Sequence, residues 1–543
     1  MLQLHNLLYL TSDSSYSNNN IGKGVTMMKK YILLILLTAS TISSFLYSSE
    51  ELRGISNFSP RSQDINAARD IVGWHPFIHR YDAHDNYYVL GFTPMYNESL
   101  RPERISLVLF NSDTFSLSGS QIPGREGTQE LLADYFGLAP NFASDAFFKP
   151  LIRNLELDMA FYFGLDKWVK GLYLQLRGPA VWTQWNLKLS ETIIDEGTVP
   201  FPAGYMAENA IIAPYDSFTQ AMKGLYPFGE VERLKYGKIC GAQTLSGLAA
   251  LEMVLGYDFI QHPYAHVGIN FRASAPTGSR PKGEFFFEPR VGCGKHWQIG
   301  VGFTGHTRVW EKDGEQELGM YVDVNFTNML KARQRRSFDF CKNGFFSRYI
   351  LTKEFNQNGI FTEKMIPAIN ITTLECDVHV SIQVDMIFMF GYRYNNFIFD
   401  IGYNGWIRSK EKICLREGIA PNTYGLKGVQ FAVNPITNQP DNTTESSATI
   451  FETQPIFSDG LMPEFLSTKD INVKSAASPL ILTQKIFWHI AYSWPHFDRY
   501  NAEPFLGIGA EIEFEGINTR NAYQPVNTTM GQASVWIKSG VSF

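Results

Sequence analysis

The stretch YAHVGINFRASA, residues 264–275, is apolar at every odd-numbered position and mostly polar or small at every even-numbered one. A period of two is typical of a β-strand with one apolar face. Residues 317–327 and 377–386 repeat the pattern. These segments exceed the roughly five or six residues of a strand in a soluble protein and fit the about 9 to 11 residues that cross a bilayer at a tilt. The stretch therefore predicts a membrane-crossing strand.

The connections between such segments alternate in length. Short links carry turn signals such as Asp313-Gly314, whereas the long links cover residues 191–246, 331–374 and 411–482. Short turns at one end and long loops at the other are typical of transmembrane barrels. We therefore predict an all-β fold: a transmembrane antiparallel up-and-down β-barrel over residues 86–543, with about 14 strands (range about 12–16) and long extracellular loops.

Two further local predictions concern strands. In residues 170–190 the apolar positions are even up to Leu176 and odd from Val181, so the phase changes at Gly178-Pro179. A β-bulge there would restore the facing of the side chains. A strand needed to complete an even number is expected near residues 71–80.

The composition agrees with a barrel and excludes other classes. Charged residues are 18% of the chain, below the globular average of about 25%, whereas aromatic residues reach 14%. The mean hydropathy of -0.14 excludes a bundle of transmembrane helices. The net charge of -6 argues against a general nucleic-acid binder. We expect the surplus aromatics, among them Trp488, Trp536 and Phe543, to lie at lipid contacts and interfacial girdles.

The N-terminal region has the pattern of an export signal. Basic residues Lys29 and Lys30 precede an apolar run over residues 31–37 and then a stretch of small residues. This pattern predicts a secretory signal peptide over residues 27–49. Residues 1–26 are then an extension of the gene model, and residues 50–85 are a periplasmic lead or an N-terminal plug.

The last strand has an apolar face that ends on the final residue, with Val535, Ile537, Val541 and Phe543 on it. This face resembles the C-terminal signal of Gram-negative outer-membrane β-barrel proteins of porin-like or transporter-like architecture. The resemblance implies recognition by the barrel assembly machinery, location in the bacterial outer membrane, and contact with its lipid and lipopolysaccharide. The N-terminal lead also resembles the hatch of the long-chain fatty-acid transporter family.

If the apolar faces meet lipid, the opposite faces line the lumen. Charges on those faces need water around them, which predicts a hydrated pore with a mixed, net acidic lining. The main functional prediction is passive diffusion of small polar solutes or ions. The alternatives are a plugged barrel, a transporter of hydrophobic, fatty-acid-type substrates, and an outer-membrane enzyme, adhesin or structural barrel. The predicted pore-lining residues are Arg272, Asp323, Asp385, Asp400, Arg408, Glu511 and Glu513.

The sequence holds no recognisable catalytic motif, and no enzyme activity or cofactor is predicted. Residues 300–305, GVGFTG, match the dinucleotide-binding pattern but lie inside a predicted strand. His75 and His79 have metal-like spacing, but without a second ligand cluster no metal is expected. Cys341 and Cys376 bracket a long loop and could form a disulfide that clips it. The partner predictions include no nucleic acid and leave a homo-oligomer open.

Overall fold

The computed structural model describes residues 54–127, 129–206, 212–427, 433–434, 439–440, 444, 447–452, 464–495, 502–514 and 530–543. The described residues all fall in one compact unit. The predicted extension and signal peptide, residues 1–49, lie outside them. Among the described residues, no helix is long and apolar enough to span a membrane.

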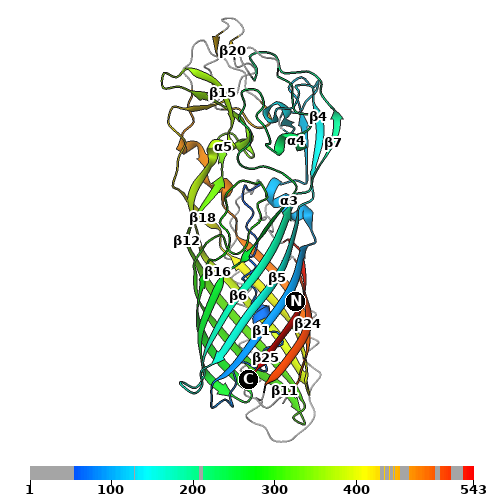
Figure 1. Ribbon diagram of the computed structural model, residues 1–543, viewed down its shortest axis with the longest axis vertical. Helices are drawn as coiled ribbons and strands as arrows, with labels where there is room; N and C mark the ends of the chain where they lie inside the picture. Colours follow the sequence, from blue (N-terminus) through cyan, green and yellow to red (C-terminus); the bar gives the residue numbers. More distant parts are fainter. Residues whose placement is uncertain are drawn as a thin grey trace, which may run out of the picture. The chain divides into compact units, whose positions relative to one another are not determined.

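The main element is an antiparallel sheet of 14 strands that closes on itself through the pairing of β12 with β16 (Figure 1). Twelve of the strands form the ring. They are β1 (Tyr87–Ser99), β5 (Leu151–Gly164), β6 (Leu172–Asn186), β9 (Leu251–His262), β10 (Ala265–Ala275), β11 (Gln298–Lys312), β12 (Gln316–Ser337), β16 (Thr373–Tyr394), β17 (Phe397–Arg408), β23 (Ile481–Ser493), β24 (Glu503–Phe514) and β25 (Gln532–Ser542).

The other two strands of the sheet continue a ring strand after a break. β8 (Ala242–Leu248) pairs with the upper half of β6, and β9 pairs with its lower half. In the same way β18 (Glu411–Leu415) pairs with the start of β16, whose remainder pairs with β17. The closed antiparallel barrel is therefore confirmed, and the predicted 14 strands are twelve in the ring plus two extensions.

The predicted bulge at Gly178-Pro179 is wrong. The pairing of β5 with β6 has no register shift between Leu151 and Gly164. The break occurs in the neighbouring strand, where the Ala249 N–H donates to the Pro179 carbonyl at 2.9 Å. The odd-numbered residues of β6 face inward both before and after Gly178-Pro179, so the facing never changes. Val181 is apolar there because it packs in a small buried cluster with Ala249 and Val291.

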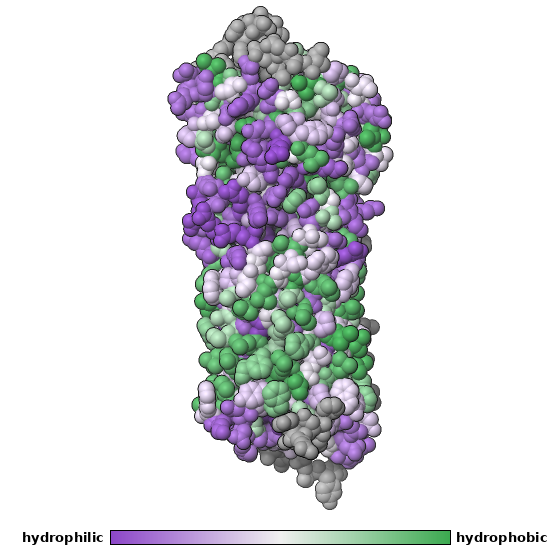
Figure 2. Space-filling view, in the orientation of Figure 1, coloured by the Kyte–Doolittle hydropathy of each residue, from purple (hydrophilic) through white to green (hydrophobic). Residues whose placement is uncertain are grey.

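The outside of the ring is apolar. Leu155, Ile269, Ile401 and Ile508 are 55%, 47%, 58% and 55% exposed, far more than an apolar side chain in a soluble core. On the face drawn in Figure 2 the middle of the barrel is largely hydrophobic, and hydrophilic surface borders it above and below. We call this apolar zone of the ring the belt. An apolar band of this kind is typical of the outer face of transmembrane barrels.

Short turns lie at one end of the barrel and long connections at the other. The short turns link β5 to β6, β9 to β10, β11 to β12 and β16 to β17, and the C-terminus lies at the same end (Figure 1). The alternation predicted from sequence is thus present in the described residues. The turn expected around residues 495–502 lies largely outside them.

The long connections fold into an ordered outer part. Its helices are α3 (Pro102–Phe110), α4 (Phe218–Met222) and α5 (Ile369–Thr372), with short 3-10 turns at Ala133–Phe136, Ser347–Tyr349, Thr468–Asp470 and Val473–Ala476. Its strands are β2 (Thr114–Ser118), β3 (Leu131–Leu132), β4 (Ala143–Phe148), β7 (Leu189–Asp195), β13 (Asp339–Phe340), β14 (Leu351–Phe355), β15 (Phe361–Pro367), β19 (Tyr424–Leu426), β20 (Val433–Asn434), β21 (Gln439–Pro440) and β22 (Ile471–Asn472). An aromatic-rich core that includes Phe142 and Phe201, both 0% exposed, holds this part together.

Candidate functional site: a filled lumen and an arginine-lined pocket

Residues 54–86 run through the barrel from the long-connection end to the short-turn end, and we call them the plug. At the upper end, the Ile55 N–H donates to the carbonyl of Val108 in the outer part at 3.1 Å. At the lower end, the Arg80 N–H donates to the hydroxyl of Tyr87, the first residue of β1, at 3.0 Å. The expected strand over residues 71–80 is absent, because this stretch lies inside the ring as the end of helix α2 (Ala67–Ile71) followed by turns.

The plug packs against the wall through apolar side chains. Trp74 is fully buried, and a Cβ on Gly91 of β1 would lie 2.5 Å from its ring, so a glycine is needed there. Ile71 belongs to a second buried cluster that includes Met389 and Trp536. Trp536 therefore faces the plug rather than lipid, and the prediction of a lipid contact there is wrong: it shares the inner face of β25 with polar side chains.

Buried ion pairs hold the plug as well. Arg61 lies 2.9 Å from Asp385, Arg69 lies 2.7 Å from Glu156, and Asp70 lies 2.7 Å from Arg177. Each pair joins the plug to a different strand of the wall. Removing one member of such a pair leaves an uncompensated buried charge, which is strongly destabilising.

The predicted pore-lining residues all lie on the inner face of the ring, but most of them contact the plug. Asp385 accepts a hydrogen bond from the Ala67 N–H at 2.9 Å, and Asp400 accepts one from the Gly73 N–H at 2.7 Å. Arg408 donates to the Ser59 carbonyl at 2.9 Å. Their role in conduction stays a prediction.

The other predicted lining residues differ in their surroundings. Glu511 pairs with Lys485 at 2.7 Å and also accepts from the side-chain amide of Asn66 in the plug at 3.3 Å. Glu513 accepts from the Met530 N–H at 2.9 Å. Arg272 lies 3.4 Å from the wall carboxylate of Glu252. Asp323 has a buried carboxylate oxygen without a hydrogen-bond partner. No local pattern predicts the plug partners of these carboxylates, since Arg61 and Arg69 lie far from them along the chain.

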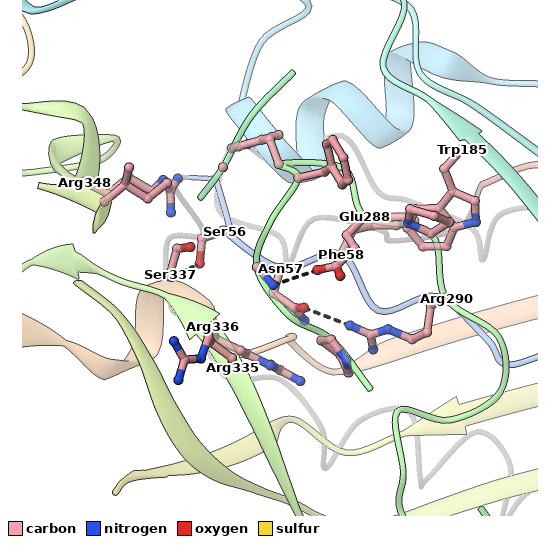
Figure 3. Close-up of a pocket in the computed structure, with 17 residues that line it drawn as sticks. Ser56, Asn57, Phe58, Trp185, Glu288, Arg290, Arg335, Arg336, Ser337 and Arg348 are labelled. Carbon is pink, nitrogen blue, oxygen red and sulfur yellow. Dashed lines mark hydrogen bonds between the residues drawn. The ribbon is translucent and has the colours of Figure 1, made fainter. Parts of the chain in front are cut away.

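A pocket lies above the plug, where the plug's first residues meet the outer part (Figure 3). Its lining is both aromatic and basic. The aromatic side chains come from the plug, from β6 and from the loop that follows β10. The lining includes Ser56, Asn57, Phe58, Trp185, Phe285, Phe286, Glu288, Arg290, Arg335, Arg336, Ser337 and Arg348.

Most of the pocket's arginines are already bonded. Arg290 donates to the Ser59 hydroxyl at 2.7 Å and to the Asn57 amide oxygen at 2.8 Å, and burial lowers its pKa to about 10. Arg336 pairs with the buried carboxylate of Glu411. These two guanidinium groups therefore shape the pocket with their contacts already made.

Arg348 is the exception among these arginines. Its side chain is fully buried, and none of its three guanidinium nitrogens makes a hydrogen bond. The Asp339 carboxylate lies 3.4 Å from Nη1, in an orientation that forms no hydrogen bond. Burial raises the pKa of Asp339, and the Arg348 charge opposes that rise. The guanidinium also lies 5.7 Å from the ring centre of Phe286 and 5.2 Å from that of Phe346. A planar guanidinium whose hydrogen-bond donors are unused can bind a carboxylate through two parallel hydrogen bonds.

The remaining predicted sites are placed as follows. Val535, Ile537 and Phe543 expose 55%, 50% and 48% of their surface on the outside of the barrel, and Val541 is half-buried on the same strand. Their role as an assembly signal stays a prediction. Cys341 and Cys376 are both free thiols, the first exposed and the second buried, so this structure does not contain the predicted disulfide.

A closed antiparallel ring with an apolar belt, short turns at one end and a folded outer part at the other is the architecture of outer-membrane β-barrel proteins. No known family model matches the sequence, and no curated protein matches it.

The comparison with solved structures found likenesses to a channel and to transporters. The COG4313 outer membrane channel from Pseudomonas putida F1 has 8% identity and a TM-score of 0.32, over 84% of this chain and 96% of that one. The toluene transporter TodX from Pseudomonas putida has 10% identity and a TM-score of 0.24, over 92% and 97%. A FadL homologue from Pseudomonas aeruginosa has 6% identity and a TM-score of 0.22, over 84% and 89%. These likenesses are weak, and nothing about a substrate passes from them to this chain.

Proposed function

We propose that this chain lies in the bacterial outer membrane and transports small organic acids with an apolar body, such as fatty acids, with the plug as its gate. The observation that carries the proposal is the combination of a plugged lumen with the buried guanidinium of Arg348 in an aromatic pocket. This guanidinium faces Asp339 at 3.4 Å but makes no hydrogen bond. The plug lies inside the ring and leaves a cavity between Asp70 and the wall residues Arg177 and Glu252. A plug in this position disfavours free diffusion of polar solutes. The pocket supplies both an anion-binding group and aromatic surface, which fit the two halves of such a substrate.

The position of the pocket supports a coupling between substrate and plug. Ser56, Asn57 and Phe58 line the pocket, and the same segment continues downward as the plug. A substrate that binds beside these residues therefore touches the upper end of the gate. A substrate that binds more tightly when the plug is displaced would open the path, since a ligand shifts an equilibrium toward the state that it binds better.

Membrane insertion is tested by placing a charge on the belt. We expect Ile508→Lys to destabilise the inserted barrel by about 2–4 kcal/mol, because the lipid face at mid-height does not solvate a charge. Ile508 is 55% exposed and lies between Ile490 and Ile537 on the neighbouring strands. The fraction that folds into lipid vesicles, read from heat-modifiable gel migration, measures the effect.

Leu225→Lys is the matched control for this substitution. Leu225 is 60% exposed but belongs to the outer part, so a lysine there should leave folding unchanged. Equal folding of the two variants would contradict the assignment of the belt to lipid.

The substrate class is tested by binding of dodecanoate and its methyl ester to the purified protein. We expect the ester to bind at least about tenfold more weakly, since it lacks the charge that a guanidinium recognises. Arg348→Gln should remove this discrimination. Because that variant leaves Asp339 without its cation, the double variant Asp339→Asn, Arg348→Gln serves as a second form. Equal affinity for acid and ester in the unmodified protein would rule out the proposed class.

Transport is tested in parallel by uptake of labelled dodecanoate into cells that make the protein and by swelling of proteoliposomes in sugars. Our proposal predicts uptake without swelling. Rapid swelling in small sugars would favour the passive pore instead.

A further inference from the structure

Four side chains of types that can bind metals lie near the short-turn end of the barrel, where the plug reaches the wall. His79 belongs to the plug, Asp258 to β9, His266 to β10 and His306 to β11. One ligand atom each of His79, Asp258 and His266 lies within 4.8 Å of the others. The second set of metal ligands, which the sequence around His75 and His79 lacks, thus comes from strands of the wall.

The contacts within the cluster are close. His79 Nδ1 lies 2.7 Å from the Oδ2 atom of Asp258. The rings of His79 and His266 stack with centroids 4.3 Å apart. The Nδ1 atoms of His266 and His306 contact each other directly. Two imidazoles and a carboxylate therefore converge on one small volume, and a third imidazole, that of His306, contacts His266 at its edge.

One polar atom of the cluster lacks a hydrogen-bond partner. Asp258 is 4% exposed, and its Oδ1 atom has no hydrogen-bond partner. A Cβ on Gly268 would lie 2.2 Å from that oxygen, so glycine leaves the carboxylate its place. A buried carboxylate oxygen without a partner is costly, and a cation relieves that cost.

The histidines are also oriented as metal ligands usually are. His266 Nε2 lies 3.2 Å from the Thr304 hydroxyl, and an Nε2–H that donates to it leaves the Nδ1 lone pair pointing at His306. Two facing lone pairs repel each other unless a proton or a cation lies between them. An outer nitrogen held by a hydrogen bond is the usual arrangement around a metal-bound histidine.

We propose that His79, Asp258, His266 and His306 bind one zinc ion or a similar divalent transition-metal cation. Imidazole with carboxylate is a donor set for zinc, whereas calcium and magnesium prefer oxygen ligands alone. Since one ligand belongs to the plug and three belong to the wall, the ion fastens the lower end of the plug to the barrel. This inference goes beyond the proposed function and does not depend on the transported substrate.

The test is equilibrium binding of Zn²⁺ to the full chain, purified without a polyhistidine tag and stripped with a chelator. We expect one Zn²⁺ per chain, with calcium and magnesium unable to compete. His79→Ala and His266→Ala should each weaken Zn²⁺ binding at least about tenfold. Loss of a residue that only hydrogen-bonds to a metal ligand already lowers metal affinity about 10–100-fold, and loss of a ligand itself should cost no less. His262→Ala is the matched control, because His262 is exposed at the end of β9, beside the same hairpin turn.

Co²⁺ provides a measurement that needs no variant. Bound at this site in the unmodified protein, it should give visible absorption bands that Zn²⁺ abolishes. Absence of saturable Zn²⁺ binding, or His79→Ala and His266→Ala variants that fold and bind as tightly as the control, would overturn the metal site. Neither outcome would bear on dodecanoate binding at Arg348, so the two proposals fail separately.

Discussion

Deletion of residues 54–79 should raise the single-channel conductance of the reconstituted protein by at least about tenfold, because a ring of twelve strands is wide enough for water once its filling is gone. The deletion removes Trp74 and Phe77, which fill the lower lumen, and the plug's ends of the ion pairs with Asp385 and Glu156. Planar-bilayer recording measures the effect. Selectivity for cations should appear at the same time, because the wall is left with an excess of exposed carboxylates.

The control for this deletion is removal of residues 356–360, the exposed turn between β14 and β15. That turn is remote from the lumen, so its loss should leave the conductance unchanged. Equal currents from the plug deletion and the intact protein would show that the plug does not occlude the barrel.

Arg177→Ala should destabilise the folded barrel by about 3–5 kcal/mol, the cost of leaving buried charges without their partner. Arg177 lies 2.7 Å from Asp70 of the plug and 3.0 Å from Asp158 of β5. Its side chain is 3% exposed, so water cannot replace it. Urea unfolding of the protein in vesicles, followed by heat-modifiable migration, measures the loss.

Arg153→Ala is the matched control, because Arg153 pairs with Glu98 but is 42% exposed. Exposed pairs contribute about 0–1 kcal/mol, so this variant should resemble the unmodified protein. A triple variant that replaces Arg177, Asp158 and Asp70 together with apolar residues should recover much of the stability. If Arg177→Ala and Arg153→Ala unfold at the same urea concentration, the buried network does not hold the plug.

The ring could be predicted from the sequence because its cause is local. Apolar and polar residues alternate along each strand, and all outward residues are expected to meet the same apolar surroundings. The apolar belt around Ile269 and Val535 can therefore be recognised in the sequence. The inner face has no such uniform partner. Trp536 and Val181 are apolar on the inner face because their neighbours there are apolar: Ile71 of the plug for Trp536, and Ala249 and Val291 for Val181. These neighbours lie far away in the chain.

The candidate sites are harder to predict from the sequence for the same reason. The lumen charges were identified, but their plug partners were not, since Arg61 and Asp385 are brought together only by closure of the ring. Arg348 reads as an ordinary loop residue in the sequence, and its lack of hydrogen bonds is a property of the folded outer part. The spacing of His75 and His79 was the one local signal for the metal cluster, and its other ligands come from three strands.

The pairing of β1 with β25 also bears on the order in which the plug and the wall come together. These two strands are the first and last of the ring, and they join over residues 89–99 and 532–542. The plug enters β1 directly and extends through the ring to the outer part. A segment in that position is enclosed most simply if it lies in place before β1 and β25 pair, so the pairing that completes the wall also encloses the plug.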